Sequence, residues 1–332
     1  MSHVPPLDPR LAALGLTAPV ALAPMAGITD LPTRQVVQGF GAGLVVSEMV
    51  ASREMVQAKR SVRDRAEIGA DAAGTSVQIA GRDAHWMAEA ARLLEGQGAR
   101  IIDINMGCPA KKVTGGLSGS ALLRDHDHAL HLIETVVAAV SVPVTLKTRL
   151  GWDDDSRDTA ALAARAEAAG IRMLTIHGRT RCQFYKGRAD WAAIRPIVDA
   201  VRIPVLANGD ITDLATARAA LRASGAAGIM VGRGIQGRPW ACAQIAAGLG
   251  QGPWVPAPTG PAFAALARDH YDRLLAFYGP DLGGRVARKH LGWYMDGAGT
   301  PAALRRTILT GAPNIVRAAL PDALTGPEAR AA

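Results

Sequence analysis

Eight short apolar runs, separated by longer segments of helical character, constrain the fold of this chain more than any other feature. Runs that are apolar on both faces are typical of parallel strands covered by helices, and Ala- and Leu-rich stretches with capping residues lie between them. The predicted strands are 20–23, 43–46, 76–79, 101–104, 142–146, 173–176, 205–207 and 228–231.

Eight strand–helix units within about 240 residues predict an α/β fold of the (β/α)8 or TIM-barrel type. An open doubly wound sheet is the alternative, and such a sheet usually carries a Gly-x-Gly-x-x-Gly turn after its first strand. Here the first strand is followed by Ala-Pro-Met-Ala-Gly at 23–27, which lacks that pattern and favours the barrel.

The chain changes character near residue 250, where a Pro- and Gly-rich stretch replaces the strand–helix alternation. Such a stretch has neither a strand nor a helix pattern, and only helical patterns follow it. We therefore expect an N-terminal tail at 1–12, a catalytic barrel at 13–250, a linker at 251–261 and a small C-terminal all-helical domain at 262–332.

Charge and cysteine usage limit the class of protein. The formal net charge is +8, which suits a polyanionic partner but also serves solubility, and charge alone does not separate the two. Cys108, Cys182 and Cys242 are scattered and odd in number, which excludes a disulfide framework or zinc site and indicates a reducing cytoplasm. The uncharged segment 11–29 is broken by prolines, so we expect no membrane span. The sequence shows no cluster of histidines and carboxylates, so we also expect no metal. We expect a monomer without an obligate protein partner.

An asparagine and a cysteine follow the fourth predicted strand, three residues apart. Gly107 and Pro109 flank Cys108 and favour a sharp turn after Asn105. A buried structural cysteine is the common alternative for a lone thiol. The polar and turn-forming neighbours favour a thiol displayed at a cleft instead.

Polar residues and glycines follow all eight predicted strands. In a barrel of this type the carboxyl ends of the strands form the active site, and the loops after strands seven and eight often bind phosphate. The segments 208–210 and 232–234 are those two loops, so we expect a phosphorylated ligand. The strand-end residues are Pro24, Met25, Ala26, Gln78, Asn105, Lys147, His177, Asn208, Gly209, Asp210, Gly232 and Arg233.

These strand-end motifs, in this order and spacing, resemble the tRNA-dihydrouridine synthases over residues 15–320. The bacterial B-type subgroup is similar at 232–240 and 288–294. The matching motifs are Ala-Pro-Met-Ala-Gly at 23–27, Asn-Met-Gly-Cys-Pro at 105–109, Lys112 with Gly115 and Gly116, Lys-Thr-Arg at 147–149, His-Gly-Arg-Thr-Arg at 177–181, Asn-Gly-Asp at 208–210 and Val-Gly-Arg-Gly at 231–234.

The resemblance implies an FMN cofactor, NADPH or NADH as reductant, and Cys108 as the catalytic acid. Gln78, Lys147 and His177 would contact the flavin. Its ribityl chain and phosphate would be held by the two phosphate loops at Asn208, Gly209, Asp210, Gly232 and Arg233, and Pro24, Met25 and Ala26 complete the expected cofactor site.

The implied reaction is chemically consistent with these residue types. The C5–C6 bond of uracil is conjugated to the C4 carbonyl, so hydride added at C6 sends negative charge to O4 and a proton must reach C5. A thiol is mostly protonated at neutral pH and can donate that proton. Asn105 is expected to hold the pyrimidine edge, and the uridine must leave its stack to enter the site.

Basic residues point to RNA as the substrate. Arginines alternate with Phe184 and Tyr185 in the loop after the sixth strand, and unpaired bases stack on such groups. The expected tRNA contacts are Lys112, Arg179, Arg181, Arg285, Arg288 and Lys289. Two other classes stay open at this point: another FMN barrel oxidoreductase, such as a dihydroorotate dehydrogenase, and an RNA-binding protein without catalysis.

Overall fold

The computed structural model describes residues 6–57, 64, 66–69 and 74–325. The chain divides into two compact units, one made of the residues up to 233 with 242–254, the other of 234–241 with the residues from 255 on. The start of the predicted tail, 1–5, and the end of the predicted helical domain, 326–332, lie outside the described residues.

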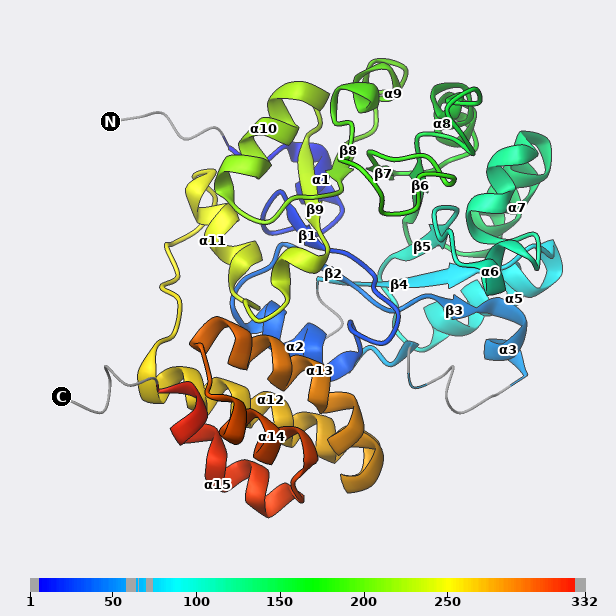
Figure 1. Ribbon diagram of the computed structural model, residues 1–332. Helices are drawn as coiled ribbons and strands as arrows, with labels where there is room; N and C mark the ends of the chain where they lie inside the picture. The colour runs from blue at the N-terminus through cyan, green and yellow to red at the C-terminus, as the bar shows by residue number, and fades with distance from the viewer. Residues whose placement is uncertain (1–5, 58–63, 65, 70–73, 326–332) are drawn as a thin grey trace. The chain divides into compact units, whose positions relative to one another are not determined.

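Within the described part of the chain, the first unit is a closed barrel of eight parallel strands surrounded by helices (Figure 1). Strand β1 pairs with both β2 and β9, and β2 pairs with β4, which closes the ring. The predicted (β/α)8 barrel is confirmed. Its strands are β1 Val20–Leu22, β2 Leu44–Val46, β4 Thr75–Ala80, β5 Ile102–Asn105, β6 Val144–Arg149, β7 Met173–His177, β8 Val205–Asn208 and β9 Gly228–Val231.

Two strands differ from the sequence prediction. A short strand β3, Val50–Ala51, pairs with β4 and was not expected, because two residues carry no periodic signal. Strand β6 continues through Lys147 to Arg149, whereas the apolar run suggested an end at residue 146. Lys147 and Arg149 are accommodated in this strand because their side chains find polar partners. Lys147 donates to the side chain of Asn208, and Arg149 donates to the carbonyl of Gly107.

Two of the helices around the barrel begin at aspartate N-caps. Asp83 accepts a hydrogen bond from the backbone N–H of Trp86 and opens helix α5, Ala84–Gly96. Asp213 and Thr216 form a capping box for α10, Leu214–Ser224, which ends at Gly225. Further helices of the first unit are α2 Leu31–Gly39, α7 His126–Ala139, α8 Thr159–Ala168 and α9 Arg195–Asp199, and most of α11 Ala241–Gly248 also belongs to it.

An apolar cluster closes the amino end of the barrel. Leu11 of helix α1, Pro9–Ala13, and Leu16 pack against inward-facing strand residues such as Leu44, Met173 and Leu206. With this end filled by apolar side chains, the polar residues of the strands gather at the opposite, carboxyl end. Functional side chains are therefore concentrated at one mouth of the barrel.

The second unit is helical. Its helices are α12 Gly260–Tyr278, α13 Pro280–Ala298, α14 Ala302–Thr310 and α15 Pro313–Leu324. His270 of α12 and Tyr294 of α13 are buried and share a 2.9 Å hydrogen bond. None of the helices in the described ranges combines the length and apolar composition that crossing a bilayer requires.

Candidate active site

The Cys108 loop is built by Asn105, the last residue of β5. The Oδ1 atom of Asn105 accepts hydrogen bonds from the backbone N–H groups of Gly107, at 3.2 Å, and Cys108, at 3.0 Å. Gly119 packs against this loop with φ +61°, and a Cβ atom there would lie 2.9 Å from the Cys108 carbonyl oxygen. The loop holds the half-buried thiol at the carboxyl end of the barrel.

A chain of hydrogen bonds between buried strand side chains orients the Asn105 amide. Its Nδ2 atom donates to Gln78 Oε1 at 2.8 Å, and Gln78 Nε2 donates to Asp103 Oδ2 at 2.6 Å. The hydroxyl of Thr145 donates to the other Asp103 oxygen, also at 2.6 Å. Burial raises the pKa of Asp103, while the two donors and the Lys147 charge oppose that rise.

Lys147 lies on the neighbouring strand, paired in register with Asn105. Its Nζ atom donates to Asn208 Oδ1 at 3.2 Å, and Asn208 Nδ2 donates to the Met230 carbonyl at 2.8 Å. Burial of the ammonium and the nearby Arg149 charge lower the pKa of Lys147 to about 8.

His177 ends strand β7 in the same mouth. Burial lowers its pKa well below the usual value, and the charges of Lys147, Arg149, Arg179 and Arg233 lower it further. Arg179 Nη1 donates to His177 Nε2 at 3.3 Å, which assigns the ring proton to Nδ1. His177 is thus a neutral imidazole with a donor at Nδ1.

Gly209 makes room for that imidazole. Its φ is +111°, and a Cβ atom there would lie 2.7 Å from His177 Cδ2. Any larger residue would displace the ring.

Arg179 and Asp210, expected at the substrate and the cofactor, are instead occupied with holding the loop after β7. The Arg179 guanidinium is buried, pairs with Asp210 at 2.6 Å, and donates to the carbonyl oxygens of Lys186 and Gly187. Asp210 also accepts the N–H of Ala189 at 2.8 Å. Their hydrogen-bonding groups are used within the chain, so we assign them to loop positioning.

Arg149 and Tyr185 belong to the site but were not among its predicted residues. The Arg149 side chain is buried, and its guanidinium donates to the carbonyls of Gly107, Thr180 and Phe184 at 2.7–2.9 Å. Tyr185 is 55% exposed, and its ring lies within 6.2 Å of the His177 ring and 5.5 Å of the Arg149 guanidinium.

Both residues had a signal in the sequence. Arg149 is two positions from Lys147, so both side chains lie on one face of β6. Tyr185 is an aromatic residue inside an arginine-rich loop.

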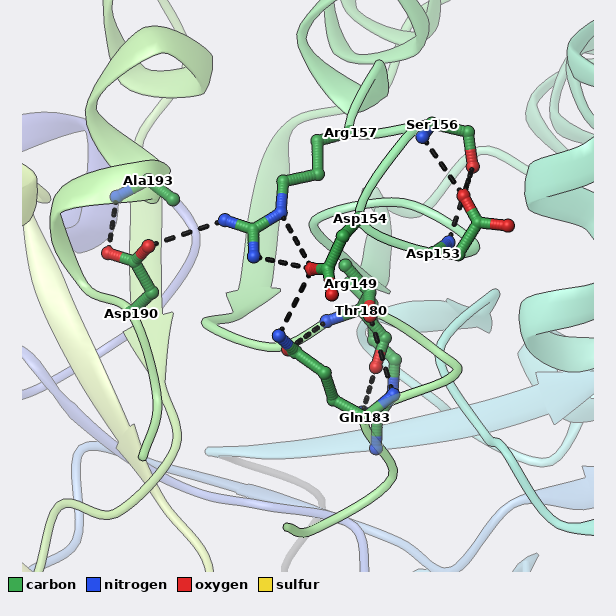
Figure 2. A network of polar contacts seen from close by, with 9 residues as sticks. All are labelled: Arg149, Asp153, Asp154, Ser156, Arg157, Thr180, Gln183, Asp190 and Ala193. Atoms are coloured by element: carbon green, nitrogen blue, oxygen red, sulfur yellow. Dashed lines mark hydrogen bonds and ion pairs between the residues drawn. The ribbon is translucent and has the colours of Figure 1, made fainter. Parts of the chain in front are cut away.

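The loop after β7 is also fastened to the loop after β6 (Figure 2). Gln183 donates to Asp154 at 3.2 Å, and its side-chain oxygen accepts the N–H of Thr180. Arg157 bridges Asp154, at 2.6 Å, and Asp190, at 3.3 Å. These contacts hold the segment that presents Tyr185 to the mouth.

One of the two predicted phosphate loops, 232–234 after β9, lies beside the loop after β1. A Cβ atom added to Gly232 would lie 3.8 Å from the Met25 sulfur and meet nothing nearer, which leaves space beside this glycine. Pro24 and Ala26 lie in the same loop after β1. The Arg233 side chain is exposed, with its guanidinium 5.3 Å from the Tyr185 ring centroid and 3.8 Å from Asp210.

The remaining predicted tRNA contacts come from both units of the chain. Lys112 lies in helix α6, Lys111–Thr114, and its side chain is outside what the structure describes. Arg181 lies in the loop after β7, and its guanidinium stacks on the rings of Trp152 and Phe184. Arg285, Arg288 and Lys289 lie on helix α13 of the second unit, where both arginines are exposed.

The sequence model of the family described as "Dihydrouridine synthase (Dus)" matches residues 21–320. The chain belongs to the dihydrouridine synthase family. Within this family, it is 63% identical to the "Probable tRNA-dihydrouridine synthase" of Rhodobacter capsulatus, over 88% of this chain and 90% of that protein. It is 50% identical to "tRNA-dihydrouridine synthase B" of Pseudomonas syringae pv. tomato, over 82% and 81%. The family resemblance predicted from the sequence is confirmed.

A solved structure shares the barrel fold of this dihydrouridine synthase family member. Histamine dehydrogenase from Rhizobium sp. 4-9 superposes with a TM-score of 0.53 at 12% identity, over 76% of this chain and 48% of that one. At this identity the likeness concerns the barrel fold alone.

Proposed function

We propose that this chain is a tRNA-dihydrouridine synthase, which reduces the C5–C6 bond of a uridine in tRNA with FMN as cofactor and NADPH as reductant. The observation that carries the proposal is the position of Cys108, fixed by Asn105 at the carboxyl end of the barrel, in a chain of the dihydrouridine synthase family. The printed names of its relatives support tRNA as the substrate.

The residues at the barrel mouth fit a flavin phosphate. Four cationic side chains surround His177 and disfavour its protonation, and the same positive field attracts an anion. Gly232 leaves space beside Met25 where a Cβ would stand. Lys147 and the Nδ1–H of His177 supply donors, and the second N–H of Gln78 Nε2 is a further one.

We assign the flavin to these groups. Lys147, His177 and Gln78 would contact its ring, and Asn208, Gly209, Gly232 and Arg233 would hold its ribityl chain and phosphate. The loop of Pro24, Met25 and Ala26 would border it. When bound, reduced FMN supplies a hydride for C6 of uracil, and NADPH restores the reduced form.

The side chains of this protein supply the rest of the reaction. Hydride addition at C6 places negative charge on C5 and O4, and the field of Lys147 and Arg149 stabilises that charge. The Cys108 S–H donates its proton to C5, which completes the addition of H⁻ and H⁺ across the double bond. Asn105, oriented by Gln78, keeps one amide N–H for the pyrimidine edge, and the exposed Tyr185 ring offers a face on which the uracil can stack.

Binding of tRNA is assigned to basic groups beyond the catalytic residues. Lys112 and Arg181 lie on the barrel unit, and Arg285, Arg288 and Lys289 lie on helix α13. Such groups neutralise phosphates and make binding salt-dependent. Arg179 is left out because its guanidinium is buried and paired.

The test is a map of dihydrouridine in tRNA from a strain that lacks this gene. Loss of dihydrouridine at particular positions is expected, with recovery on expression of the wild-type chain but not of Cys108→Ala. The purified protein should be yellow and release FMN on denaturation. An unchanged dihydrouridine map would overturn the proposed activity, and release of FAD would overturn the cofactor assignment.

A further inference from the structure

Two arginines and two aromatic side chains form a stack beside the active site. The Arg124 guanidinium lies 5.0 Å from the Trp152 ring centroid, and the Arg181 guanidinium lies 4.6 Å from the same centroid. Arg181 is also 5.0 Å from the Phe184 ring. These residues come from the loops after β5, β6 and β7, so the Arg124–Trp152–Arg181–Phe184 stack joins three loops at the carboxyl end of the barrel.

The two arginines of the stack lack acidic partners. Some exposed arginines of this unit pair with carboxylates, as Arg165 does with Asp127 at 2.6 Å. No ion pair among the described residues includes Arg124 or Arg181, and the buried Nε of Arg181 has no hydrogen-bond partner there. Aromatic faces hold these guanidiniums, which leaves N–H donors for an external acceptor.

Two carboxylates that follow Trp152 in the sequence are bound to other groups. Asp153 accepts hydrogen bonds from the backbone and hydroxyl of Ser156, and Asp154 is bound to Arg157 and Gln183 (Figure 2). Two guanidiniums near one indole repel each other, and an anion beside them would offset that repulsion. The stack therefore favours an anionic partner.

The stack is ordered before any ligand binds. Arg149 donates to the carbonyls of Thr180 and Phe184, on either side of Arg181, and Phe184 is held at φ +53°. Strained backbone of this kind persists where surrounding contacts fix it, often at functional sites. A guanidinium that is already fixed loses little conformational freedom on binding.

We propose that Arg124, Trp152 and Arg181 form a docking surface for the phosphodiester backbone of RNA, at nucleotides flanking the uridine that enters the barrel. Arg181 Nη2 lies 3.5 Å from Thr114 Oγ1 of α6, the helix that follows the Cys108 loop, so the surface adjoins the catalytic loop. The proposal rests on the proposed function, because it takes tRNA as the ligand. It adds Arg124 and Trp152 to the groups that recognise it.

The experiment titrates the full-length protein with unmodified tRNA at several salt concentrations. Arg124→Gln removes one exposed charge, and the slope of log K against log salt should shrink by about 0.7–0.9 for one lost phosphate contact. Trp152→Leu keeps both charges but removes the ring that holds the two guanidiniums in place. The affinity for tRNA should therefore fall several-fold, with a smaller change in slope. Arg165→Gln, which removes an arginine already paired with Asp127, should match the wild type.

The outcomes separate this proposal from the proposed function. Wild-type affinity and slope in both Arg124→Gln and Trp152→Leu would overturn the docking surface and show that the stack only ties loops together. Dihydrouridine formation by the wild-type protein on the same tRNA is measured in parallel. If no dihydrouridine forms, the catalytic assignment fails, while the salt slopes still decide whether the stack binds RNA.

Discussion

Gln78 donates a 2.6 Å hydrogen bond to the buried carboxylate of Asp103, and this contact fixes the orientation of two amides in the barrel. Gln78 presents its nitrogen to Asp103 and its oxygen to the Nδ2 atom of Asn105. Asn105 must then turn its own oxygen to the N–H groups of the Cys108 loop. Asp103 is thereby a positioning residue for the proposed catalytic thiol.

Asp103→Asn should loosen this chain of amides, because an amide at 103 can also donate and no longer fixes Gln78. Loss of a hydrogen bond worth about 0.5–1.5 kcal/mol should lower kcat/KM for tRNA by roughly 2–10-fold. Thr145→Val is the matched control, since it removes the other hydrogen bond to Asp103 and leaves Gln78 in place. It should lower the melting temperature but largely retain kcat/KM. Equal kcat/KM for Asp103→Asn and wild type would contradict the positioning role.

Flavin affinity should depend on pH through Lys147. Its pKa is lowered to about 8, so the ammonium is charged below that pH and neutral above it. The charged form attracts a phosphate-bearing ligand, so FMN should bind the flavin-free protein more tightly at pH 7 than at pH 9. Fluorescence quenching measures the two dissociation constants. Lys147→Met should bind more weakly and show a much smaller change between these pH values. An equal pH dependence in wild type and variant would assign the effect to another group.

Much of the fold could be predicted from the sequence because local signals agreed with the tertiary structure. The eight barrel strands fall on the predicted apolar runs, and Asp83 and Asp213 cap the helices that follow two of them. The prediction ended β6 too early because a charged residue usually closes an apolar run. Lys147 and Arg149 continue the strand since their side chains meet polar partners at the barrel mouth.

The site was only partly predictable, because several of its relationships exist only in three dimensions. Asp103 and Asn105 share a face of β5 by strand alternation, but nothing in the sequence pairs Asp103 with Gln78 on another strand. The pairing of Trp152 with Arg124 and Arg181 joins three loops and has no local pattern either. Arg179 was expected to contact RNA because it lies in an arginine-rich loop with aromatic residues. Its burial against Asp210 changes that assignment.

The helical unit should lose stability in acid through a buried histidine pair. His270 and His290 lie 4.8 Å apart between ring centroids, and burial lowers the pKa of His270 to about 4 and that of His290 well below 6.5. Both are neutral in the folded state, whereas the unfolded chain takes up protons below about pH 6.5. Stability should therefore fall as the pH drops from 6.5 toward 4.

His290→Phe is the variant that checks this prediction. The Nε2 atom of His290 has no hydrogen-bond partner among the described residues, so phenylalanine removes a titrating group without breaking such a bond. The melting temperature of this variant should fall less between pH 6.5 and pH 4 than that of the wild type. A parallel decline in both proteins would mean that other groups control acid unfolding.

The central claim is that Cys108 protonates C5 of a tRNA uridine, and single-turnover kinetics test it most directly. Pre-reduced protein is mixed with unmodified tRNA, and dihydrouridine is quantified over time for the wild type and for Cys108→Ala at matched flavin content. Removal of a positioned acid typically slows such a step by about 10²–10⁴-fold, so the variant should bind flavin and tRNA yet form dihydrouridine at that reduced rate. Formation of dihydrouridine by Cys108→Ala at the wild-type rate would contradict the account.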